Sequence, residues 1–118
     1  MKKTINIKLY KDNELTQEYK NINSIYNETI SFNIDNTHTK ITNTNFIREN
    51  DEYIFNIDLI QKEAYYILKE KNIKLDIEVY ESSINRKEEI IEIIYKIETE
   101  EPVTKILIES EWFKWQVL

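Results

Sequence analysis

Residues 72–109 read NIKLDIEVYESSINRKEEIIEIIYKIETEEPVTKILIE, and apolar residues alternate with polar ones along three parts of this stretch. The alternating apolar residues are Ile73, Leu75, Ile77 and Val79, then Ile91, Ile93, Tyr95 and Ile97, and finally Ile106 and Ile108. Period-two alternation places successive side chains on opposite faces of a β-strand. Because only short polar breaks at 82–87 and 100–102 separate the three runs, the stretch predicts three neighbouring antiparallel strands.

The rest of the chain repeats this pattern, with alternation predicting further strands at 5–10, 15–19, 30–34 and 53–59. The Thr- and Asn-rich segment 37–45 predicts an edge strand or an exposed strand of weak register, and 21–28 predicts irregular structure. The 118 residues are long enough for one core only, so we expect a single domain over 1–118. About eight antiparallel strands in one small all-β domain predict a closed barrel or a sandwich.

Residues 59–71 fit two patterns. Leu59, Ala64 and Leu68 belong to a helical stripe, whereas the run from Ala64 to Leu68 also suits a short strand. We expect at most one helical turn near Gln61, followed by a strand.

Composition excludes several classes of function. A net charge of −6 argues against direct nucleic-acid or anionic-membrane binding, and the absence of Cys excludes disulfides and thiolate chemistry. The N-terminal residues are basic but lead into alternation instead of an apolar run, so we expect no signal peptide. No apolar run approaches the roughly 20 residues of a membrane span, and a cytoplasmic protein is therefore the default expectation.

Glycine is absent from the chain, although tight β-turns usually need a residue of positive φ. Asn and Asp tolerate the left-handed region better than other residues with a side chain. We therefore expect turns at Asp12-Asn13, at Asp35-Asn36 and at 49–51.

From His38 onward the chain resembles the YwiB-like family of small bacterial proteins. The resemblance lies in Ile41, Phe46-Ile47, Phe55, Tyr65-Tyr66, and the runs 73–79, 93–97 and 105–108. It implies a lipocalin-like (calycin-type) antiparallel β-barrel, and it implies no activity, because none is established for the family. The chain departs from the family pattern at Asn72, where a Gly is expected, and in its shorter N-terminal half.

No residue pattern predicts catalysis, a metal site or a cofactor. His38 is the single His and lies in a polar segment, so we expect it on the surface. The acidic clusters at 49–52, 98–101 and 109–111 lack the form of a Ca²⁺ loop and predict solvated turn and edge charges. Ser82-Ser83 has neither an elbow motif nor a base, so we expect no enzyme.

Two aromatic features suggest binding. Tyr95 shares a face with Ile93 and Ile97, so its hydroxyl is predicted to point into the barrel as a ligand-binding group. The bulk of Ile, Phe and Tyr favours a filled barrel over a hollow one.

The C-terminal tail carries Trp112, Phe113 and Trp115. The tail either packs back onto the barrel or serves as an aromatic anchor for a protein partner or for a second copy of the chain in a homodimer.

The leading functional hypothesis is therefore a non-enzymatic binding protein that takes a small apolar ligand in the barrel or a protein on its rim. The alternative is an acidic inhibitor or decoy that occupies a basic nucleic-acid-binding surface of another protein, which is motivated by the −6 charge.

Overall fold

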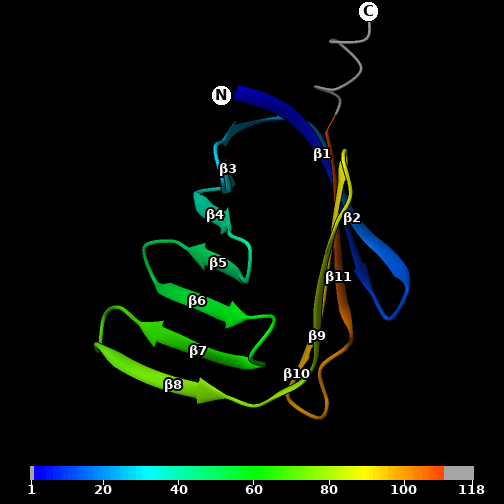
Figure 1. Ribbon diagram of the computed structural model, residues 1–118. Helices are drawn as coiled ribbons and strands as arrows, with labels where there is room; N and C mark the ends of the chain where they lie inside the picture. The colour runs from blue at the N-terminus through cyan, green and yellow to red at the C-terminus, as the bar shows by residue number, and fades with distance from the viewer. Residues whose placement is uncertain (1, 111–118) are drawn as a thin grey trace, which may run out of the picture.

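A computed structural model describes residues 2–110, which form one antiparallel sheet of eleven strands (Figure 1). The strands are β1 (Lys2–Lys11), β2 (Glu14–Tyr26), β3 (Ile30–Ile34), β4 (Thr37–Ile41), β5 (Asn45–Glu49), β6 (Tyr53–Asp58), β7 (Glu63–Leu68), β8 (Ile73–Ile77), β9 (Val79–Arg86), β10 (Ile90–Ile97) and β11 (Thr104–Ser110). The all-β antiparallel prediction is confirmed, but the expected count of about eight strands is wrong.

The sheet is nearly closed into a barrel. Its strand order is β8-β7-β6-β5-β4-β3-β2-β1-β11-β10-β9, so the two edge strands are consecutive in the sequence and Glu78 alone joins them. Figure 1 shows β3 to β8 as one half of the molecule, facing a second half that contains β1, β2 and β9 to β11. The side chains enclosed between the halves form the core.

Two side-chain hydrogen bonds fasten the edge strand β9 to the opposite half. Ser82 Oγ donates to the carbonyl of Leu59 at 2.7 Å, and Arg86 Nη2 donates to the carbonyl of Thr42 at 2.6 Å. Both acceptors lie in turns of the other half, so these bonds take the place of a strand-to-strand ladder at that edge.

The inner face of the sheet is dominated by β-branched and aromatic residues, which suit a pleated surface. The largest fully buried side chains of the core come from both halves and from the turn after β6: Ile5, Ile41, Ile57, Leu59, Ile93 and Ile108. Alternation in β10 and β11 places Ile91, Ile93, Tyr95, Ile106 and Ile108 inside, as the sequence predicts.

Among residues 2–110, six of the eight residues with positive φ are Asn or Asp, and the other two are Lys62 and Glu98. Asp12, Asn13, Asp35 and Asn36 have φ between 48° and 67° at the two predicted hairpin turns. Asn72 also has a positive φ, of 50°, in the turn before β8.

Three expectations about strand boundaries are wrong. The alternating run from Ile73 to Val79 is not one strand, because β8 ends at Ile77 and β9 begins at Val79. It is β9 that pairs with β10, whereas β8 lies at the other end of the strand order. Residues 82–87 are not a polar break, since β9 continues to Arg86 and Ile84 packs against the core. Residues 37–45 do not form an edge strand: β4 lies between β3 and β5 with Ile41 fully buried.

The expected turn near Gln61 is present. The Lys62 amide donates to the Asp58 carbonyl at 2.9 Å, which makes a single i-to-i−4 turn, and β7 follows directly. Residues 2–110 contain no helix.

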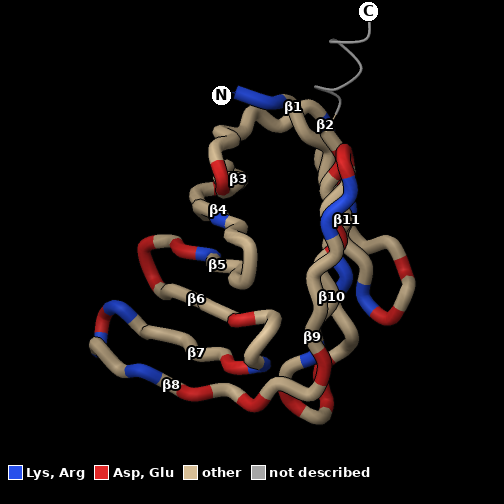
Figure 2. Tube along the Cα trace, viewed as in Figure 1, with Lys and Arg blue, Asp and Glu red and all other residues tan. Residues whose placement is uncertain are grey.

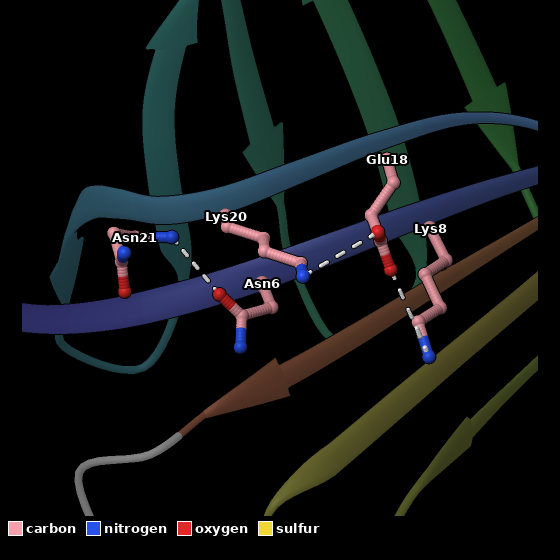
Figure 3. A network of polar contacts seen from close by, with 5 residues as sticks. All are labelled: Asn6, Lys8, Glu18, Lys20 and Asn21. Atoms are coloured by element: carbon pink, nitrogen blue, oxygen red, sulfur yellow. Dashed lines mark hydrogen bonds and ion pairs between the residues drawn. The ribbon is translucent and has the colours of Figure 1, made fainter.

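The segment 21–28 also differs from expectation, because β2 runs on to Tyr26 through a β-bulge at Asn21. The pairing of β1 with β2 shifts between Ile5 and Ile7, and Asn21 has a φ of 58°. Figure 3 shows Asn6 Oδ1 accepting a hydrogen bond from the Asn21 amide at 2.9 Å. Near the bulge, the Glu18 carboxylate forms ion pairs with two lysines: Oε2 lies 3.9 Å from Lys8 Nζ, and Oε1 lies 3.8 Å from Lys20 Nζ (Figure 3).

We predict that Asn21→Ala lowers the free energy of unfolding by about 1–2 kcal/mol, because Ala resists the left-handed region that the bulge requires. Asn21→Gly should match or exceed the wild type. Urea denaturation measures both values, and Asn23→Ala in the same strand is the control, with an expected change within about 0.5 kcal/mol. A similar loss for Ala and Gly at position 21 would contradict this account of the bulge.

Candidate functional site

Polar side chains form a row across β10, β11 and β1 on the inner face of the sheet. Tyr95 pairs with Thr104 in the β10–β11 ladder, and Thr104 pairs with Lys11 in the β1–β11 ladder. The Lys11 ammonium donates to the Thr104 hydroxyl at 2.7 Å, and the same hydroxyl is hydrogen-bonded to the Tyr95 hydroxyl. Thr104 therefore links a lysine to a buried phenol.

A second row crosses the opposite half. Arg48 of β5 pairs with Phe55 of β6, and Phe55 pairs with Tyr66 of β7. Arg48 shares the inner face with the buried Phe46, because the two are separated by one residue in a strand. The second row thus presents an arginine and aromatic rings towards the first.

Aromatic rings fill the space between the two rows. The Tyr95 ring centroid lies 5.9 Å from that of Phe46 and 5.9 Å from that of Phe55. The Phe55 ring in turn lies 4.8 Å from Tyr66, whose other neighbour is Tyr53 at 5.8 Å. The interior is filled at this level by rings from both halves.

Two cavities lie beside this aromatic layer, and Arg48 lines both of them. The first is an open cavity of about 540 Å³, which we call the polar pocket; its inner wall carries Lys11, Arg48, Tyr66, Tyr95 and Thr104. The second is an apolar cavity of about 130 Å³, lined chiefly by Ile7, Leu9, Tyr19, Phe32, Ile34, Phe46 and Ile106.

Arg48 has no carboxylate partner within 4.0 Å among residues 2–110. Asp76, Glu98 and Glu101 also line the polar pocket, but all three are exposed side chains at its rim. Water screens these carboxylates, so they weaken the positive potential of the inner wall without cancelling it. The inner wall of the pocket is therefore positive, and the rim is negative.

Burial changes the acidity of the inner groups. It raises the pKa of Tyr95 to about 12, an effect that the nearby Arg48 partly offsets. It also raises the pKa of Tyr66, with a further rise from Tyr53, and it lowers the pKa of Lys11. The Tyr95 phenol is consequently neutral at pH 7 and can act as a hydrogen-bond donor.

The groups of the polar pocket are poorly suited to proton transfer at neutral pH. A phenol with a raised pKa is a poor base or nucleophile at neutral pH, and Arg cannot give up its proton. The single His38 is exposed and lies outside the polar pocket, with Nδ1 2.9 Å from Asn33 Oδ1. Within residues 2–110, no three acidic or His side chains gather as metal ligands.

Of the site residues predicted from the sequence, one lies in the described part of the structure and three do not. Tyr95 lies on the inner face, is 8% exposed and lines the polar pocket. Trp112, Phe113 and Trp115 lie outside the described residues.

Sequence reasoning missed Lys11, Arg48 and Tyr66. Alternation could have indicated Arg48, since it lies two residues after Phe46, but the β5 strand itself was not predicted.

The chain matches no protein-family model, no curated protein and no solved structure. The resemblance to the YwiB-like family therefore stays a prediction. No helix within residues 2–110 is long and apolar enough to cross a bilayer.

The pKa of Tyr95 makes stability depend on pH in a defined window. In the unfolded chain a tyrosine has a pKa of about 10. Because folding favours the neutral phenol, its contribution to stability is complete below about pH 10 and is lost as the pH rises to about 12. We expect the wild type to lose stability more steeply across this window than Tyr95→Phe.

Urea denaturation over a pH series tests this expectation. Below about pH 9 the two curves should run parallel, with Tyr95→Phe about 1 kcal/mol less stable because its hydrogen bond to Thr104 is lost. Equal slopes above pH 10 would show that the Tyr95 phenol is not buried in the folded protein.

Proposed function

We propose that the chain is a non-enzymatic binding protein for a small amphiphilic molecule that carries one anionic group, such as a carboxylate. The anionic group is held by Arg48 in the polar pocket, with Lys11 and the Tyr95 hydroxyl beside it. The apolar part of the ligand lies against the aromatic layer and extends into the apolar cavity.

The observation that carries this proposal is the position of Arg48. It is half-buried, faces inward and lines both cavities, yet it has no carboxylate within 4.0 Å in the described part of the chain. Removing a charge from water costs free energy unless a partner compensates it. A bound carboxylate, which accepts two parallel hydrogen bonds from a guanidinium, would supply that partner.

The rim of the polar pocket restricts the ligand further. Asp76, Glu98 and Glu101 surround the entrance and repel a group with several negative charges. The electrostatic repulsion grows with the charge of the ligand, so it is smaller for a single carboxylate than for a phosphate or a nucleotide. The pocket therefore favours a monoanion.

The alternative of an acidic decoy has less support. Figure 2 shows Lys and Arg interspersed with Asp and Glu along the chain, without one side reserved for acidic residues. A surface that imitates nucleic acid needs a continuous negative potential, so we favour the ligand-binding proposal.

Sodium octanoate is a suitable probe, with octanamide as its uncharged counterpart. Octanoate should stabilise the wild type in a thermal-shift assay and bind in a calorimetric titration, whereas octanamide should bind more weakly. Arg48→Met keeps an unbranched, flexible side chain but removes the guanidinium and its charge. It should weaken octanoate binding by at least about tenfold, because a hydrogen bond to a charged group contributes about 1.5–3 kcal/mol.

The control is Lys40→Met, which removes one positive charge from an exposed position of β4 and should leave octanoate binding unchanged. Without ligand, Arg48→Met should be at least as stable as the wild type, because Arg48 has no ion pair to lose. Equal affinity for octanoate and octanamide, or no binding of either probe, would overturn the proposal.

A further inference from the structure

Strand β8 is an open edge of the sheet. It pairs with β7 on one side, and on its other side no strand of residues 2–110 pairs with it. In Figure 1 it forms the outermost strand of its half. The opposite edge strand, β9, differs in being fastened by Ser82 and Arg86 to turns of the other half.

The two faces of β8 are different. Its inner face carries Ile73, Leu75 and Ile77, of which Ile73 is 42% and Leu75 46% exposed despite their apolar side chains. Its outer face carries Lys74 and Asp76, which appear as a blue and a red segment along β8 in Figure 2. Exposed apolar residues on an unpaired edge form a site where another strand can add.

We propose that β8 pairs with the β8 strand of a second copy, antiparallel and centred on Leu75, so that the sheets of two molecules join. In this register Leu75 faces its counterpart, and Ile73 of each copy faces Ile77 of the other. Lys74 of each copy faces Asp76 of the other, which gives two opposite-charge pairs. The sequence of β8 is therefore complementary to itself, as a two-fold symmetric interface requires.

Neighbouring registers are worse. Centring on Lys74 or on Asp76 would place like charges directly opposite each other, which is destabilising. A shift by a single residue would bring apolar and charged side chains onto the same face. One register is thus favoured over the others, and the pairing is limited to two copies because each molecule has one such edge.

Sedimentation velocity of the full chain over a concentration series tests the proposal. The wild type should form a dimer as concentration rises. Lys74→Asp alone and Asp76→Lys alone should each weaken dimerisation roughly tenfold, because both charge pairs become like-charged. An equimolar mixture of these two variants should dimerise again, since the four charges then pair as opposites.

The control is Lys40→Asp, which makes the same charge change at an exposed position of an interior strand and should leave the dimer intact. Circular dichroism shows whether each variant is folded. Hydrogen exchange should slow at residues 73–77 on dimerisation. A wild type that stays monomeric at every concentration, or a dimer that the β8 variants do not affect, would overturn the proposal.

Discussion

The contact of the Tyr95 ring with Phe46 and Phe55 joins the two halves of the sheet. Strand β10 and strands β5 and β6 are far apart in strand order, so this contact exists only because the sheet folds across itself. The fold buries an inner face of Ile and aromatic residues that an open sheet would leave in water. Burial of the Tyr95 ring also removes its hydroxyl from water, and the hydroxyl then requires a partner, which Thr104 provides. The polar row that ends at Lys11 thus follows from an apolar contact.

Local physics accounts for much of this fold. Apolar residues at two-residue spacing in 30–34, 53–58 and 90–97 predict strands because one face of each is buried, and Asn or Asp pairs predict the hairpin turns in a chain without glycine. The predictions that are wrong concern segments whose burial depends on strands far away in the sequence. The Thr- and Asn-rich composition of 37–45 predicts an edge or exposed strand, but β4 pairs with β3 on one side and with β5 on the other. The alternation from Ile73 to Val79 continues without a break in the sequence, whereas in the structure Glu78 separates the two edge strands of the sheet.

The candidate site is harder to predict than the fold. Alternation alone places Tyr95 inside, because its neighbours at two-residue spacing are apolar. Nothing local brings Tyr95 to Arg48: they belong to strands in opposite halves, and their proximity depends on how the sheet closes. Lys11 lies at the end of an alternating run, and a charged residue at such a position ordinarily indicates that the strand ends and the chain becomes exposed to solvent. The pairing of β1 with β11 turns this residue into part of a pocket wall.

The open edge and the polar pocket share a boundary. Leu75, at the centre of β8, also lines the polar pocket together with Asp76 and Ile77. A second copy paired along β8 would therefore lie next to the wall of the pocket and would neutralise Asp76 with a lysine. Neutralising one of three rim carboxylates makes the entrance less repulsive to an anion. Any effect of dimerisation on ligand affinity must be matched by an equal effect of the ligand on dimerisation, because the two equilibria are linked. The two proposals share Asp76, but each also rests on a residue that the other does not use: Arg48 lies in β5, away from the edge strand, and Lys74 does not line the polar pocket.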